Sequence, residues 1–142
     1  CTFEGCDFTN ANIAHTIFND VTFEDCKMVG LQFETCNQLL LSLKFIRCNL
    51  SVASFIGMNL PGIQFHDCKL HQTDYTDAHL KQAKFPNCDF ENAIFENTHL
   101  ELADFTSAIN FNIDPSINQV KKTHFSKGGL IGLLKKYDIV VT

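Results

Sequence analysis

An apolar residue recurs at every fifth position along most of this 142-residue chain. A period of five matches neither the 3.6-residue period of a helix nor the two-residue period of a strand. It predicts a coil that turns a corner every five residues and places one large side chain of each segment inside. The members of this central series are Phe3, Phe8, Ile13, Phe18, Phe23, Met28, Phe33, Phe45, Leu50, Phe55, Leu60, Phe65, Leu70, Tyr75, Leu80, Phe85, Phe90, Phe95, Leu100 and Phe105.

Small residues, mostly Cys, Ala and Thr, form a second series two positions before the central one. One large and one small inward side chain per segment suit a narrow interior at native packing density. Like residues also recur 20 positions apart, as in the central Phe residues at 45, 65, 85 and 105. Four segments per coil would stack these sets into columns, whereas a three-sided coil would repeat at 15 and mix Phe with Leu. We therefore predict an all-β solenoid with four sides, and a structural core that includes Phe3, Phe23, Phe45, Phe65, Phe85, Phe105, Cys48, Cys68 and Cys88.

The central series is interrupted once, between Phe33 and Phe45. The gap of 12 residues exceeds two segments by two. Shifting the register by two restores the columns, pairing Phe23 with Phe45 and placing Leu40 between Phe18 and Leu60. The sequence thus predicts a two-residue bulge within 34–42.

Four segments, Cys6–Asn10, Cys88–Asn92, Ala93–Asn97 and Ala103–Ser107, resemble the A-(D/N)-(L/F)-x-x unit of the pentapeptide-repeat family. The resemblance covers residues 1–109 and implies a right-handed quadrilateral β-helix of about five 20-residue coils. Residue 1 is already in register, and the end coils of a repeat array need caps. We therefore expect further coils to precede Cys1.

Residues 110–142 are predicted to form a C-terminal cap. Leu130, Leu133, Leu134 and Tyr137 have the spacing of an amphipathic helix, and Ile139–Val141 is typical of a short strand. In pentapeptide-repeat proteins resembling this chain, a C-terminal helix and strand join two solenoids tail to tail. The predicted cap and dimer contacts are therefore Leu130, Leu133, Leu134, Tyr137, Ile139, Val140 and Val141.

No catalytic motif is present: the chain has no glycine-rich phosphate loop, no HExxH and no nucleophile elbow. We predict no enzyme activity, no catalytic residue, no cofactor and no metal. His79 and His99 are 20 apart and are expected to stack on one outer face, as solvated side chains. The seven Cys residues lack a CxxC pair and are interpreted as free buried thiols, which favours a cytoplasmic location. No apolar run approaches the length of a membrane span.

Charge is unevenly distributed along the chain. Residues 1–109 contain 14 acidic and 6 basic side chains, and residues 110–142 contain 2 and 5. An acidic solenoid without a Lys/Arg stripe argues against direct nucleic-acid binding. The repeats and the tail Gly129–Val141 resemble the quinolone-resistance and microcin-immunity branch of the family, whose members bind DNA gyrase or topoisomerase IV and protect it from poisons.

That resemblance implies a DNA mimic whose outward carboxylates enter the groove that holds duplex DNA. The candidate contacts are Asp67, Asp74, Asp77, Asp89, Glu91, Glu96, Glu101 and Asp104, with Glu4, Asp7, Asp20, Glu24 and Asp25 nearer the start. The alternative is a structural or interaction scaffold with an unrelated protein partner, or a domain of a larger signalling protein. Mimicry requires the acids to cluster on one or two faces, whereas a scaffold allows a scattered arrangement and a flat apolar patch.

Overall fold

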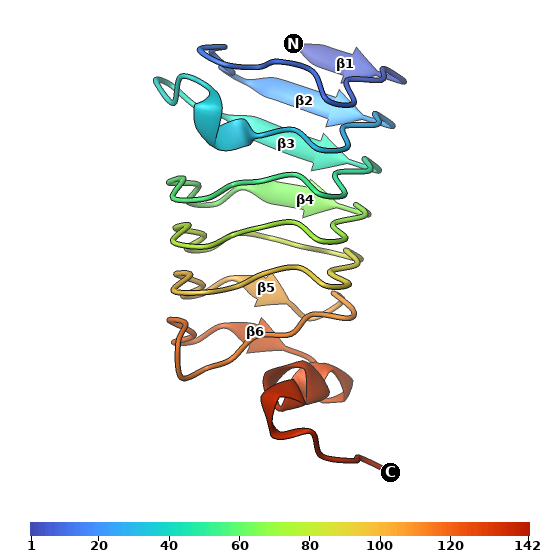
Figure 1. Cartoon of the computed structure of the whole chain (residues 1–142), viewed down its shortest axis with the longest axis vertical. Helices are drawn as coiled ribbons and strands as arrows, with labels where there is room; N and C mark the ends of the chain where they lie inside the picture. Colours follow the sequence, from blue (N-terminus) through green and yellow to red (C-terminus); the bar gives the residue numbers. More distant parts are fainter.

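Most five-residue segments end in a corner with a positive φ angle. Residues Asn10, Asp77 and Asn97 have φ angles of 58°, 59° and 51° at such corners, and Gly62 has 71°. Gly, Asn and Asp enter this left-handed region more readily than other residues. The computed structural model describes all of residues 1–142, and it shows these corners folding the chain into stacked coils (Figure 1).

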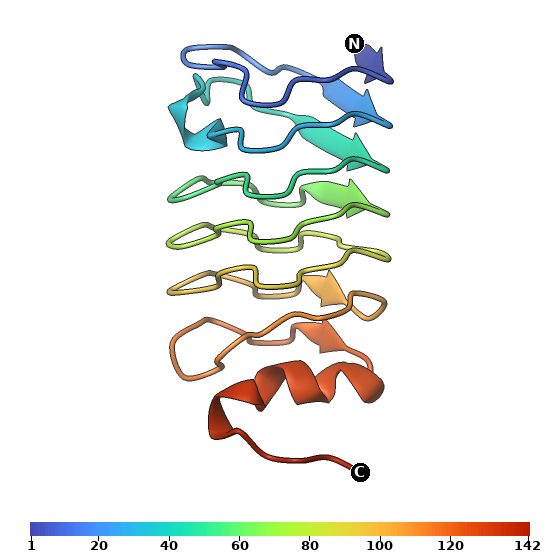
Figure 2. The same ribbon diagram turned by 45° about the vertical axis from the view of Figure 1, so that its right-hand side comes forward.

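The coils are held together by parallel strand pairing. β1 (Thr2–Glu4), β2 (Val21–Glu24), β3 (Leu43–Ile46) and β4 (Gln64–His66) form one sheet, and β5 (Asp104–Phe105) pairs with β6 (His124–Phe125) in a second. Isolated bridges such as Asp74 with Ile94 continue the same register on the other sides. The chain is therefore a four-sided β-solenoid, as predicted, and Figure 2 shows its coils stacked along one axis.

Two columns of aromatic rings fill the interior. Phe45 and Phe65 stack with centroids 5.0 Å apart and an interplanar angle of 10°, and Phe33 and Phe55 stack at 4.8 Å and 5°. Tyr75 continues the second column and is fully buried. Every predicted core residue is buried except Phe3, which is 37% exposed because β1 lies at the outer edge of the sheet and contacts only the coil of Phe23.

The bulge lies within the predicted segment. Ile17 pairs with Asn37 at an offset of 20, whereas Val21 pairs with Leu43 at an offset of 22. The two additional residues therefore fall between Asn37 and Leu43, just after the short 3-10 helix η1 (Phe33–Thr35). The prediction that Leu40 fills the core was wrong: its φ of 56° turns it outward, and its side chain is 66% exposed.

The solenoid has about six coils and continues past Ala108, where the central series was expected to stop. Phe125 pairs with Phe105 in β6, and the two rings stack at 5.7 Å. The sixth coil differs from the pattern because Asn118 takes an inward position. Its buried side chain accepts a hydrogen bond from the Thr98 N–H at 2.8 Å and donates one to the Phe95 carbonyl at 2.9 Å.

The cap follows β6 and differs in detail from the prediction. It consists of two 3-10 helices, η2 (Gly128–Leu133) and η3 (Lys135–Tyr137), in place of one α-helix. Gly132 lies directly against Phe111, and its carbonyl accepts a hydrogen bond from the Ile113 N–H at 2.9 Å. Ile139–Val141 forms no strand, because a left-handed turn at Asp138 is followed by chain without a pairing partner. None of the helices is long and apolar enough to cross a bilayer.

Truncating the aromatic column is expected to destabilise the solenoid strongly. Phe65→Ala removes a fully buried ring between Phe45 and Phe85 and should lower the free energy of unfolding by about 3–5 kcal/mol. The control Ile109→Ala, at a side chain that is 54% exposed, should change it by less than about 0.5 kcal/mol. Urea denaturation measures both, and similar losses in the two variants would contradict the packing described.

The cap depends on a close approach at Gly132. A Cβ there would lie 2.6 Å from the Phe111 carbonyl oxygen, whereas a Cβ at Gly128 would meet open space. We expect Gly132→Ala to lower the free energy of unfolding by about 1–3 kcal/mol, as in other overpacked sites. Gly128→Ala is the matched control, and hydrogen exchange of the cap amides localises the effect. Equal protection in both variants would show that the cap does not need this contact.

Candidate functional site

The coil register divides the outer surface into four sides. In the coil of residues 63–82, the first side is 63–67, the second 68–72, the third 73–77 and the fourth 78–82. Corresponding segments in the other coils follow at intervals of 20, or of 22 across the bulge. Every outward side chain can therefore be assigned to one side.

The predicted acidic contacts do not form a single patch. They lie on all four sides, with three of the eight main candidates on the third. The first side carries Asp67 and Asp104, the second Asp89 and Glu91, the third Asp74, Asp77 and Glu96, and the fourth Glu101. The acids nearer the start are also divided, with Glu4, Glu24 and Asp25 on the first side, Asp7 on the second and Asp20 on the fourth.

On three of the sides, acidic residues are mixed with Lys or Arg. Asp25 forms an ion pair with Arg47 at 2.8 Å on the first side, and the guanidinium hydrogen bond holds the pKa of that carboxyl below its usual range. On the fourth side, the Glu101 carboxylate lies 3.4 Å from the His99 imidazole. These carboxylates are partly compensated by neighbours, which reduces the negative field above them.

From the coil of Glu34 to the coil of Glu96, the third side carries negative charge without a basic residue. These segments contain Glu34, Asp74, Asp77 and Glu96. The next segment on this side, 113–117, adds Asp114, whose charge is paired with Lys136 of the cap. Three of the four carboxylates are held by neutral donors: Ser54 Oγ donates to Glu34 at 2.7 Å, Thr76 Oγ to Asp74 at 2.6 Å and Asn97 Nδ2 to Asp77 at 2.7 Å. These hydrogen bonds orient the carboxylates but leave their charge uncompensated.

Two isoleucines lie among these carboxylates. Ile56 and Ile94 are each 41% exposed on the same side. Partly exposed apolar side chains beside charged groups are typical of surfaces that contact other macromolecules. We call this surface, made of Glu34, Ile56, Asp74, Asp77, Ile94 and Glu96, the acidic third side. Three of its acids, Asp74, Asp77 and Glu96, are among the contacts predicted from the sequence, whereas Glu34, at the edge of the bulge segment, is not.

The density of charge on the acidic third side is comparable with that of one DNA strand. Its four carboxylates span four coils, about 19 Å at a strand spacing of ~4.8 Å. One strand of a duplex carries a phosphate every ~3.4 Å, or about six over that length. The four carboxylates therefore supply about two-thirds of the strand's charge, without an opposing cation within the side.

The cysteines are free thiols, and two of the histidines stack on each other. All seven Cys are free, as predicted; Cys1 is exposed, Cys6 is partly buried and the others are buried. Burial raises the pKa of the Cys26 thiol, whereas a nucleophilic thiol needs a lowered pKa. His79 and His99 stack on the fourth side with ring centroids 4.2 Å apart, which confirms the predicted stacking.

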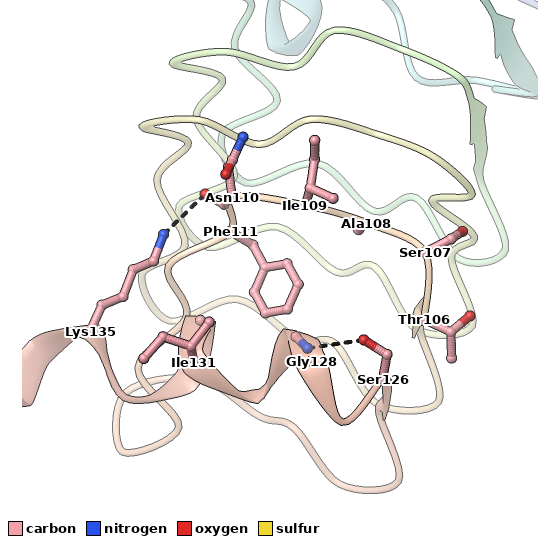
Figure 3. A pocket seen from close by; sticks show the side chains of 12 residues that line it. Thr106, Ser107, Ala108, Ile109, Asn110, Phe111, Ser126, Gly128, Ile131 and Lys135 are labelled. Atoms are coloured by element: carbon pink, nitrogen blue, oxygen red, sulfur yellow. Dashed lines mark hydrogen bonds between the residues drawn. The ribbon is translucent and has the colours of Figure 1, made fainter. Parts of the chain in front are cut away.

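A hollow of about 400 Å³ lies between the last coil and the cap. Figure 3 shows Phe111 projecting into it and the Lys135 ammonium reaching toward the Asn110 carbonyl, 3.5 Å away. Among the lining residues, Lys135 alone has an ionisable side chain, and the remainder are hydroxyl, amide, glycine and apolar residues. The hollow therefore brings together no acid and base for proton transfer.

A family model described as the pentapeptide repeat region matches residues 1–66 and 37–105. Among solved structures, full-length QnrB1, a plasmid-mediated fluoroquinolone resistance protein, is 13% identical over 98% of this chain and 100% of its own, with a TM-score of 0.38. HetL of the cyanobacterium Nostoc sp. strain PCC 7120, involved in regulating heterocyst differentiation, is 13% identical over 88% and 84%, with a TM-score of 0.39. No curated protein matches the chain.

The cap is joined to the sixth coil by a charge pair whose titration can be measured. Hydrogen bonds from Ser116 and from the Lys136 ammonium, 2.9 Å away, lower the pKa of Asp114 to about 2. Because this folded-state pKa lies below the ordinary value of 3.8, the pair stabilises the protein above about pH 4 and is lost as pH falls toward 2. In Lys136→Met the pKa of Asp114 should rise, as followed by carboxyl carbon shifts in NMR. An unchanged pKa would contradict the pairing.

Proposed function

Because this chain belongs to the pentapeptide-repeat family, we propose that it is a non-enzymatic binding protein whose acidic third side occupies the DNA-binding surface of a protein partner. The observation that carries the proposal is the row of uncompensated carboxylates on this side, which lacks any Lys or Arg. The other three sides mix both signs of charge. A partner that binds DNA presents cations at phosphate spacing, and this is the side that complements them.

The rigid four-sided rod suits such a role. Parallel pairing fixes Asp74 beside Ile94 on the neighbouring coil, so the carboxylates on this side are positioned before binding. Preorganised charges lose little conformational freedom on association, which favours affinity. Ile56 and Ile94 add apolar contact area that DNA itself would not offer and that a protein partner can recognise.

The partner that we propose is a type II topoisomerase, DNA gyrase or topoisomerase IV. This choice rests on the resemblance of the repeats and of the tail Gly129–Val141 to the topoisomerase-protecting branch of the family. The protein would then shield the topoisomerase from quinolones or toxins in the cytoplasm, a location that seven free thiols favour.

Dimerisation through the cap is part of the same proposal. Leu130 of η2, Leu134 between η2 and η3, and Tyr137 of η3 are exposed. Ile139, Val140 and Val141 extend from the body with exposures of 49%, 88% and 65%. Burying these side chains against a second copy would remove apolar surface from water. Two rods joined at this end would double the length of acidic surface without changing its charge density.

The alternative is an interaction scaffold whose partner is unrelated to DNA. The bulge supports this alternative, because Leu39 and Leu40 are 63% and 66% exposed beside each other. Neighbouring exposed leucines offer an apolar contact that needs no charge complementarity. Under this hypothesis the carboxylates serve solvation, and their replacement would leave partner binding intact.

A supercoiling assay with DNA gyrase and a fluoroquinolone tests the proposal. The wild-type protein should restore supercoiling in the poisoned reaction, and the variant Asp74→Asn/Asp77→Asn/Glu96→Gln should not. The matched control, Glu4→Gln/Glu24→Gln/Asp104→Asn, removes three charges from the first side and should protect like wild type. Protection should also weaken as salt is raised, because exposed charges are screened.

The outcomes separate the two functions. Equal protection by both triple variants would contradict the assignment of the acidic third side. No protection by wild-type protein, with its fold and oligomeric state verified in the same sample, would contradict topoisomerase protection and favour the scaffold. Asn fits the positive φ of Asp77, so the first variant should retain its fold.

A further inference from the structure

We propose that His71, Asp89 and Glu91 on the second side form a binding site for a divalent transition-metal ion such as Zn²⁺. One ligand atom from each residue lies within 4.8 Å of the other two. His71 Nε2 is 2.7 Å from Asp89 Oδ2 and 3.7 Å from Glu91 Oε2. This surface lies apart from the acidic third side, so the proposal is independent of the one above.

The repeat brings these ligands together from two coils. His71 and Glu91 each follow the central residue of a segment, and they are 20 residues apart. They therefore lie one above the other on successive coils. Asp89 precedes the same central residue, Phe90, and reaches His71 diagonally. Around a Zn²⁺ ion with bonds of ~2.0–2.2 Å, tetrahedral ligand atoms are about 3.4 Å apart. The separations of 2.7 Å and 3.7 Å from His71 Nε2 fall on either side of that value, so small side-chain rotations suffice.

Asp89 is oriented by partners of its own. Its Oδ1 accepts hydrogen bonds from the Glu91 N–H at 3.1 Å and from Asn110 Nδ2 at 3.0 Å. Oδ2 is thereby directed to His71. Metal sites in proteins commonly hold their ligands through such outer hydrogen bonds. Asn110 belongs to the next coil, so three successive coils contribute to the arrangement.

The surrounding charges favour a cation. Lys69 lies beside Asp89 in register, but no Lys or Arg forms an ion pair with Asp89 or Glu91. Carboxylate oxygens are anionic ligands, and histidine coordinates a metal ion through a neutral ring nitrogen.

One imidazole nitrogen and two carboxylate oxygens suit Zn²⁺, Co²⁺ or Mn²⁺ better than a soft ion that prefers thiolates. Water would complete the coordination. The ion would link the coil of His71 to the coil of Glu91 from outside, in addition to the backbone ladder. Metal binding to the folded chain should therefore raise its melting temperature.

Calorimetric titration with Zn²⁺, with Co²⁺ absorption as a second readout, tests the site on the full chain. Wild type should bind one ion per chain, melt at a higher temperature with Zn²⁺, and lose affinity as pH falls and the ligands protonate. His71→Ala and Glu91→Gln should abolish or strongly weaken all three effects. Asn110→Gly, which keeps the positive φ of that corner, should weaken binding by about tenfold.

His79→Ala is the matched control, because it removes a histidine from the stacked pair on the fourth side and leaves the proposed ligands intact. It should bind Zn²⁺ like wild type. Binding lost in His79→Ala but kept in His71→Ala would overturn the assignment, as would the absence of a stoichiometric Zn²⁺ complex in folded wild type. Circular dichroism without metal verifies the fold of each variant.

Discussion

The parallel backbone ladder between successive coils constrains everything else in this molecule. It holds each coil one strand spacing from the next, so every residue lies against the residue 20 positions away, or 22 across the bulge. A large ring above a small side chain would leave a void, and two mismatched rings would clash. The columns Phe45–Phe65–Phe85 and Phe55–Tyr75–Phe95 satisfy this constraint with stacked rings. At Asn118, which departs from the pattern, the side chain forms hydrogen bonds with the Thr98 N–H and the Phe95 carbonyl of the neighbouring coil.

Because the inward pattern is so regular, much of the fold could be predicted from sequence. The four sides, the Phe columns, the location of the bulge and the stacked His79 and His99 all follow from periods of five and 20. Leu40 was misplaced because the five-residue register, which predicts the inward positions, does not apply within the bulge. The sixth coil was missed because Asn118 and the turn at Asp114 break the apolar pattern although Phe125 resumes it. The cap was only partly predictable, since the helical spacing of Leu130 to Tyr137 does not distinguish an α-helix from 3-10 turns.

The candidate surfaces were harder to predict. Knowing that a side chain points outward does not tell which of the four sides it occupies. The acids chosen from sequence lie on all four sides, and the feature that separates the third side is an absence of cations, visible only after the segments are sorted by side. The cluster of His71, Asp89 and Glu91 was missed for a related reason. Two of its members are 20 apart, but the third is reached diagonally, and its orientation depends on Asn110 in another coil. The inward residues thus determine the fold, and they place little constraint on which residues face outward.

The corners of the solenoid determine which insertions and deletions preserve its outer surface. Each segment of five turns the chain through one side, so a deletion of 20 residues removes a whole coil and leaves later side chains facing as before. A deletion of five would preserve the inward alternation of small and large residues, yet it would rotate every later outward residue onto the adjacent side. The two-residue bulge between Asn37 and Leu43 avoids this rotation, because it adds length within one side and returns the chain to the same corner. Lineages of this architecture can therefore lose or gain whole coils and keep a binding surface, whereas changes of one segment redistribute it around the rod.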